Sequence, residues 1–184
     1  MKLLVGPLAA IEAMCAEHRP SHLVSWLSPP AVAPAIAAAA ALDARLLLCS
    51  HDVAQAGEGF EPPGAEHLAR LLAFARGWDG ARPMLVHCWA GVSRSTAAAF
   101  AIACQARPQI SESELARRLR RLSPTATPNP LIVALADAQL GRKGRMSAAI
   151  AGIGRGSETA LGAPFALDLT TGAGSPPPRP NYAE

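Results

Sequence analysis

The sequence predicts an α/β domain in which a central, mostly parallel sheet is flanked by helices and followed by a helical C-terminal half. Short apolar runs without polar alternation recur through the first half of the chain, as expected of strands covered on both faces. Helical patterns lie between these runs, and alternating strands and helices favour a parallel sheet. With 184 residues, half of them apolar, the chain has the size and composition of one globular domain.

The four expected strands are apolar runs bounded by polar residues, glycine or proline. They cover residues 3–5, 23–27, 46–49 and 84–86. The fourth continues through His87 into Cys88, so a cysteine is expected where a buried strand ends. Because α/β sheets bind ligands at the carboxyl ends of their strands, this junction is a candidate site.

The first segment with helical periodicity is residues 64–78, between the third and fourth expected strands. One apolar stripe runs along that segment and consists of Leu68, Leu71, Leu72 and Ala75. From Ser95 onward a second helix is apolar nearly all round and is expected to be buried. The alanine run at residues 37–41 is also expected to be helical.

Two further helices are indicated by their N-terminal caps. Ser111 and Glu114 form an S-x-x-E capping box. Asn129 followed by Pro130 gives a cap and a proline at the first helical position, which opens a helix through about residue 140. In the first of these two helices the residues expected to face inward are Leu115, Leu119 and Leu122. Those expected to form a solvated face are Arg117, Arg118, Arg120 and Arg121.

The chain divides into a functional domain at residues 1–150 and a C-terminal extension at residues 151–184. From about residue 170 the extension is rich in glycine, proline and serine and has little to bury, so it is expected to be flexible.

Composition narrows the expected partners. The net charge of +3 is too small for nucleic acid or an anionic membrane to be the main partner. The four cysteines are far apart, with no C-x-x-C pair and no histidine in zinc-ligand spacing, so neither a disulfide scaffold, a metal nor a cofactor is expected. Gly6-Pro7 and Glu12 interrupt the apolar start of the chain, which argues against an export signal. We expect a cytoplasmic monomer.

The segment between the fourth strand and the buried helix has the composition of an anion-binding loop. Its residues are Trp89, Ala90, Gly91, Val92, Ser93 and Arg94. The peptide N–H groups of such a loop can curl around a phosphate-sized anion, helped by the positive end of the following helix. Gly91 supplies the backbone freedom that a tight loop needs.

A cysteine at the edge of this loop gains reactivity, because the field that binds a dianion also stabilises a thiolate. Arg94, six residues after Cys88, has a planar fork that can hold two phosphoryl oxygens. Ser95 can donate a hydrogen bond to the sulfur when it leaves again. Together these parts predict phosphoryl transfer through a cysteinyl-phosphate.

His87-Cys88, five residues and then Arg94-Ser95 resemble the H-C-x5-R-[ST] signature of cysteine-based protein tyrosine phosphatases. Gly91 and the serine before Arg94 make the segment most similar to the small dual-specificity branch. The resemblance implies hydrolysis of phosphomonoesters, with phosphotyrosine and also phosphoserine or phosphothreonine in proteins as substrates. It further implies that His87 orients the cysteine through a hydrogen bond.

The same resemblance implies an aspartate, on a loop before the cysteine, that protonates the leaving oxygen. Asp52 lies 36 residues before Cys88 and directly after the third expected strand, and we predict that it is this general acid. Glu58 and Glu61, in the same loop, are the alternatives.

Other functions stay open at the level of sequence. A phosphate-recognition module without turnover would use the same loop, and so would a phosphatase for a phosphoinositide or nucleotide, or a sulfur-transfer domain. Cys15, Cys49 and Cys104 are expected to be inert core thiols. Cys49 and Cys104 are also the candidates for a reversible disulfide with an oxidised Cys88.

Overall fold

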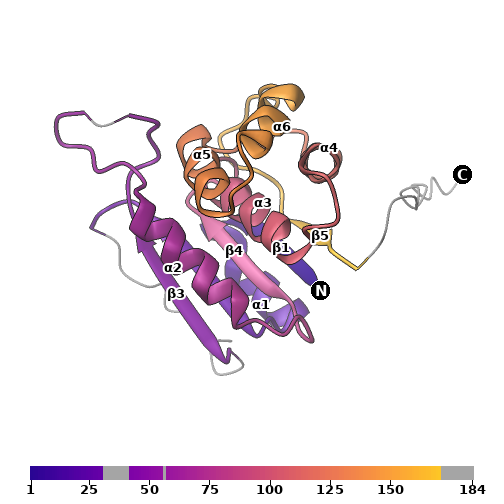
Figure 1. Cartoon of the computed structure of the whole chain (residues 1–184). Coiled ribbons are helices and arrows are strands. Elements are labelled where there is room, and N and C mark those ends of the chain that lie inside the picture. The colour runs from indigo at the N-terminus through magenta and orange to yellow at the C-terminus, as the bar shows by residue number, and fades with distance from the viewer. Residues whose placement is uncertain (31–41, 56, 171–184) are drawn as a thin grey trace, which may run out of the picture.

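The computed structural model describes residues 1–30, 42–55 and 57–170 and has the predicted α/β architecture (Figure 1). One sheet holds five strands in the order β3-β2-β4-β1-β5. The strands are β1 Lys2–Pro7, β2 His22–Leu27, β3 Ala44–Cys49, β4 Met84–Cys88 and β5 Phe165–Asp168. The first four pair in parallel, and β5 pairs antiparallel with β1. All four expected strands are confirmed, and each is longer than the apolar run that predicted it.

Helices lie on both faces of the sheet, but unequally (Figure 1). The helices are α1 Ile11–His18, α2 Ala65–Arg76, α3 Arg94–Ala106, α4 Glu112–Leu122, α5 Pro130–Gln139 and α6 Arg145–Ile153. In the larger core, the helices from α2 through α6 pack against one set of strand residues, which includes Val24 and Val86. A smaller core joins α1 with the alternate set, including Leu23 and Leu85. Apolar runs without alternation supply both cores, because successive strand side chains point to opposite faces.

Both predicted cap residues cap their helices, but only half of the capping box at Ser111 is found among the described hydrogen bonds, because the Glu114 carboxylate accepts from Arg117, Arg118 and Arg121. Ser111 Oγ accepts a hydrogen bond from the N–H of Glu114 at 3.2 Å, and α4 begins at the next residue. Asn129 Oδ1 accepts from the N–H groups of Leu131 and Ile132 at 3.0 and 3.1 Å, directly before α5.

Several features differ from the sequence predictions. Leu122, expected to face inward, is 44% exposed because it is the last residue of α4 and lies beyond the core. Arg120 was expected on a solvated face, but it donates hydrogen bonds to four backbone carbonyls beside the C-terminal end of α6. The elements α1, α6 and β5 were not predicted individually. The expectations for residues 37–41 and for the tail from residue 171 lie outside the described residues.

The four parallel strands bring their carboxyl ends to one edge of the sheet. Pro7 of β1 lies beside Cys88 of β4, and Leu27 of β2 lies beside Cys49 of β3. The segments that follow these strands therefore meet at this edge, where α/β proteins place their sites. In the part of the chain that the structure describes, no helix combines the length and apolar character needed to cross a membrane.

Candidate active site

The loop at residues 89–94 has its carbonyl groups turned outward. Leu8 N–H donates to the carbonyl of Trp89 at 3.1 Å, and Gly162 N–H donates to that of Ala90 at 2.8 Å. Two further carbonyls accept in the same way: that of Val92 from the N–H of Thr127, and that of Ser93 from the N–H groups of Ala97 and Asn129. Among the hydrogen bonds of the described residues, a peptide N–H of this loop donates in only one, from Gly91 to sulfur. The remaining N–H groups are left for an anion inside the loop, as in other backbone anion sites.

Gly91 allows this geometry for two reasons. Its φ of +72° lies in the left-handed region, where a side chain is strained. A Cβ at this position would also lie 2.6 Å from the backbone nitrogen of Pro7 and 2.7 Å from the carbonyl carbon of Gly6. The loop therefore approaches β1 more closely than any residue with a side chain would permit.

The sulfur of Cys88 lies at the bottom of this loop and is 1% exposed as a residue. Gly91 N–H donates to Sγ at 3.2 Å, and the Ser95 hydroxyl lies 3.2 Å from the same atom. A thiol would donate to that hydroxyl, whereas a thiolate would accept from it. Two donors and the N-terminal end of α3 thus face the position where a thiolate carries its charge.

His87 is fully buried beside Cys88 and is held from both ring nitrogens. Its Nε2 lies 2.7 Å from Ser25 Oγ, and its Nδ1 lies 3.4 Å from the carbonyl oxygen of Cys88. Burial lowers the pKa of His87 to about 4, while the contact with the Cys88 carbonyl opposes the shift. A neutral imidazole at neutral pH fits Nδ1–H donating to the carbonyl and Nε2 accepting from Ser25. The histidine thereby holds the backbone of the cysteine.

Arg94 is 4% exposed and is anchored by one edge of its guanidinium. Its Nη1 donates to the carbonyl of Ser50 at 2.7 Å and to the hydroxyl of Ser28 at 3.0 Å. Trp26 Nε1 donates in turn to Ser50 Oγ at 2.8 Å. Arg94 Nε is buried and has no hydrogen-bond partner in the described part of the chain. A buried donor of this kind is costly unless a ligand satisfies it, so the unanchored edge suits a phosphoryl group.

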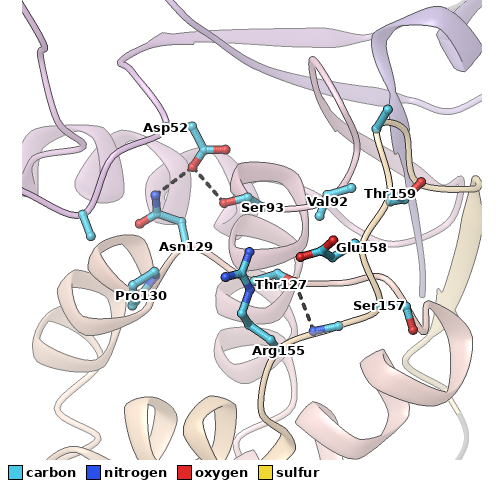
Figure 2. Close-up of a pocket in the computed structure, with 13 residues that line it drawn as sticks. Asp52, Val92, Ser93, Thr127, Asn129, Pro130, Arg155, Ser157, Glu158 and Thr159 are labelled. Carbon is cyan, nitrogen blue, oxygen red and sulfur yellow. Dashed lines mark hydrogen bonds between the residues drawn. The ribbon is translucent and has the colours of Figure 1, made fainter.

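Asp52, the expected general acid, lies at the end of the anion loop (Figure 2). Its Oδ1 accepts from Ser93 Oγ and from Asn129 Nδ2, both at 2.8 Å. Its Oδ2 lies 3.6 Å from Arg94 Nε. Since Oδ1 is occupied by two donors, Oδ2 is the oxygen left to exchange a proton with a leaving group or with water.

The other residues of the predicted site are more peripheral. Trp89 is 66% exposed on the rim of the loop. Glu58 and Glu61 are exposed, and the described contacts of Glu61 join its backbone to His51. Of the three acidic candidates in this segment, only Asp52 has a described contact with the anion loop.

Sequence reasoning missed four residues that support this site. Ser28 and Ser50 each directly follow a strand, which is the signal that could have placed them beside Arg94. Trp26 acts through Ser50. Asn129 was predicted as a helix cap, but it uses Oδ1 for the cap and Nδ2 for Asp52, so one side chain ties α5 to the acid.

Comparison with known proteins shows the fold. No protein-family model matches the chain, and no curated protein matches its sequence. The structure of DUSP15 matches with a TM-score of 0.60 and 16% identity, over 82% of this chain and 90% of that one. The human tyrosine phosphatase-like serine/threonine/tyrosine-interacting protein gives 0.58 and 17%, over 77% and 92%. PTPMT1, solved in complex with PI(5)P, gives 0.57 and 14%, over 82% and 92%. The chain therefore has the fold of the small dual-specificity phosphatases.

Proposed function

We propose that this protein is a cysteine-dependent phosphatase that hydrolyses phosphomonoesters, with phosphotyrosine in proteins as the main substrate and phosphoserine or phosphothreonine as further substrates. The observation that carries the proposal is the anion loop, in which outward carbonyls leave N–H groups around Cys88 Sγ and Arg94 presents an unsatisfied Nε. Donors held in place before the reaction are the main source of transition-state stabilisation in such sites.

In the first step the thiolate of Cys88 attacks phosphorus and the bond from phosphorus to the ester oxygen breaks. The leaving oxygen takes a proton from Asp52 Oδ2 and departs as the neutral alcohol or phenol, and Asp52 remains as a carboxylate. Arg94 and the loop N–H groups stabilise the charge on the three equatorial oxygens. The products of this step are a cysteinyl-phosphate and the free alcohol or phenol.

In the second step water attacks the phosphorus of the cysteinyl-phosphate, and Asp52 accepts its proton. The bond from phosphorus to sulfur breaks, and the electron pair returns to Sγ as a thiolate. The Ser95 hydroxyl and the Gly91 N–H lie where they can donate to that sulfur. Asp52 is then protonated and the thiolate restored, so the site is ready for another turnover.

Hydrolysis of aryl phosphates in the presence of a metal chelator tests this proposal. Wild-type protein should release phosphate, and Cys88→Ser should lower kcat by at least about 10³-fold because the nucleophile is lost. Asp52→Asn should slow phenyl phosphate, a poor leaving group, by about 10²-fold and p-nitrophenyl phosphate much less.

Three outcomes would redirect the proposal. Binding of phosphotyrosine peptides without any turnover would favour a recognition module, the class suggested by the name of the tyrosine phosphatase-like interacting neighbour. Efficient turnover confined to phosphoinositides would favour a lipid substrate, as the PI(5)P complex of PTPMT1 suggests. Consumption of thiosulfate would favour sulfur transfer.

A further inference from the structure

A groove extends from the anion loop to the segment that follows α6. It has a volume of about 770 Å³. Its lining on the catalytic side includes Asp52 and Ser93, and Asn129 and Pro130, at the start of α5, also line it (Figure 2). The opposite wall carries Arg155 and Glu158, whose side chains point into the groove (Figure 2). Asp52 and Ser93 belong both to this groove and to the candidate active site, so the groove begins where the anion loop ends.

Arg155 is presented by a segment held in place from below. Arg120 Nη1 donates to the carbonyls of Ile153 and Arg155 at 2.8 and 3.1 Å, and its Nη2 donates to those of Gly154 and Ala126 at 2.9 and 2.8 Å. Four charge-assisted hydrogen bonds from one guanidinium fix the turn that carries Arg155.

The next residue of the segment packs just as closely. Gly156 N–H donates to Thr127 Oγ1 at 3.1 Å (Figure 2). A Cβ on Gly156 would lie 2.5 Å from the backbone carbonyl of Thr125, so only glycine allows this approach. Arg155 therefore projects from a rigid wall rather than from a loose loop.

The charge at the tip of Arg155 is not used within the described part of the chain. Arg155 is exposed, and among the described residues its guanidinium has no ion pair and no hydrogen bond. Figure 2 shows the guanidinium directed toward Asp52, Ser93 and Asn129. The charge of Asp52 is already matched by its donors and by Arg94. Ser93 and Asn129 are the N-terminal caps of α3 and α5, so the positive ends of two helices also face this region.

We propose that the groove is a subsite for a second anionic group of the substrate, a carboxylate or a second phosphate, and that Arg155 binds this group. The proposal rests on the phosphatase function proposed above, because it concerns the same substrate molecule. Glu158, on the same wall, opposes the anion and limits its affinity. The two side chains therefore have effects of opposite sign: Arg155 selects for an acidic neighbour of the phosphorylated residue, and Glu158 selects against one.

The test measures binding rather than turnover, so it remains informative whether or not the protein hydrolyses phosphate. The probes are peptides in which phosphonodifluoromethyl-phenylalanine replaces phosphotyrosine, with glutamate, phosphoserine, glutamine or lysine on both sides. Wild-type protein should bind the glutamate peptide about threefold to fivefold more tightly than the glutamine peptide, the range of an exposed ion pair. The phosphoserine peptide should bind about tenfold more tightly than the glutamine peptide, because phosphoserine carries more negative charge and more hydrogen-bond acceptors than glutamate.

Variants assign the effect to the groove. Arg155→Met should lower the affinity for the acidic peptides more than the affinity for the glutamine peptide, so that the preference is lost, and Arg155→Lys should restore part of the preference. Glu158→Gln should increase it by about twofold to threefold. Arg117→Met is the matched control, because Arg117 is a 57%-exposed arginine on α4 and does not line the groove.

Equal binding of the glutamate and glutamine peptides by wild-type protein would overturn the proposal. The proposal would also be overturned if wild-type protein bound the lysine peptide more tightly than the glutamine peptide and Glu158→Gln weakened that binding. The groove would then bind a cation. Hydrolysis of phenyl phosphate by the wild type, measured in parallel, reports on the phosphatase function alone, and its failure leaves the peptide comparison decisive for the groove.

Discussion

Cys88 and Cys104 lie near the two ends of α3, and each is only 1% exposed. The groups around Cys88 favour a negative charge on sulfur, whereas those around Cys104 oppose one. The sulfur of Cys88 meets a peptide N–H and a hydroxyl at the N-terminal end of the helix. Cys104 lies in the last turns of the helix, where burial raises its thiol pKa to about 12. The carboxylates of Glu112 and Asp137 add to that shift, and Arg142 only partly offsets it.

The comparison teaches that burial alone does not decide whether a thiol reacts. Both sulfurs are removed from bulk water, but only Cys88 has donors aimed at it and the positive end of a helix behind it. A thiol among carboxylates at the negative end of a helix stays protonated and behaves as a small apolar side chain. The donors around sulfur, and not its exposure, separate the candidate nucleophile from the core residue.

The largest expected effect tests this comparison directly. Cys88→Ser should abolish aryl phosphate hydrolysis, a loss of at least about 10³-fold, because the chemistry needs the thiolate. Cys104→Ala should stay within about twofold of the wild type in kcat and lose only about 1 kcal/mol of stability through the small cavity it leaves. Steady-state kinetics and urea unfolding measure the two quantities.

Alkylation separates the two sulfurs without mutation. Iodoacetamide at pH 7 should modify Cys88 and inactivate the protein in parallel, and peptide mass mapping should find Cys104 unmodified in the folded state. Equal labelling of both residues would show that donors at sulfur do not control reactivity here.

Most of the fold was predictable because its signals are local. Apolar runs, the Ser111 and Asn129 caps and the buried helix after Arg94 each depend on neighbours in the sequence. The strand β5 has only four residues, too few for a clear periodicity, and its partner β1 lies near the other end of the chain. The sequence therefore did not predict it. Arginine periodicity likewise cannot show that Arg120 lies against the end of α6 rather than in solvent.

The site divides in the same way. The signature around Cys88 lies within nine residues, so the sequence alone was enough to predict a chemistry for it. The anchors Ser28 and Ser50 reach Arg94 only because the parallel strands end at one edge of the sheet. Arg155 joins the groove only through tertiary packing, and no local motif marks it.

The second expected effect concerns the loop that creates the donors around Cys88. Gly91 and Gly141 both have positive φ, +72° and +62°, but a Cβ clashes only at Gly91. Gly141→Ala should cost about 1 kcal/mol of unfolding free energy from the backbone alone. Gly91→Ala should cost about 3 kcal/mol, because overpacking against β1 adds to the backbone strain. Urea unfolding measures both.

Activity measurements distinguish the same two glycine variants. Gly91→Ala should lower kcat/KM for aryl phosphates by at least about tenfold, because displaced N–H groups no longer converge on the anion. Gly141→Ala, far from the loop in sequence and with no atom within 4 Å of its Cβ, should keep the wild-type value. Similar losses of stability and activity in the two variants would mean that the close approach of the loop to β1 is not required.

The smallest expected effect concerns how the residue before Cys88 is kept neutral. The folded pKa of His87 is about 4 and the unfolded value is about 6.5, so the unfolded chain binds the proton more readily between these pH values. The contribution of His87 to the free energy of unfolding is therefore fully present above pH 6.5. It decreases as the pH falls below this value and becomes constant below pH 4. The loss amounts to about 2.5 kcal/mol by pH 4.5, from about 1.4 kcal/mol per pH unit.

Glutamine at position 87 does not titrate, so the free energy of unfolding of His87→Gln should be lower than that of the wild type at pH 7 but should change less between pH 6.5 and 4.5. This range isolates His87 from Glu114 and Asp168, whose lowered pKa values make their contributions fall only at more acidic pH. Urea unfolding of both proteins at half-unit pH steps gives the difference curve. If the two curves run parallel, the acid sensitivity of the fold has another source, and the histidine beside Cys88 is not held neutral by its burial.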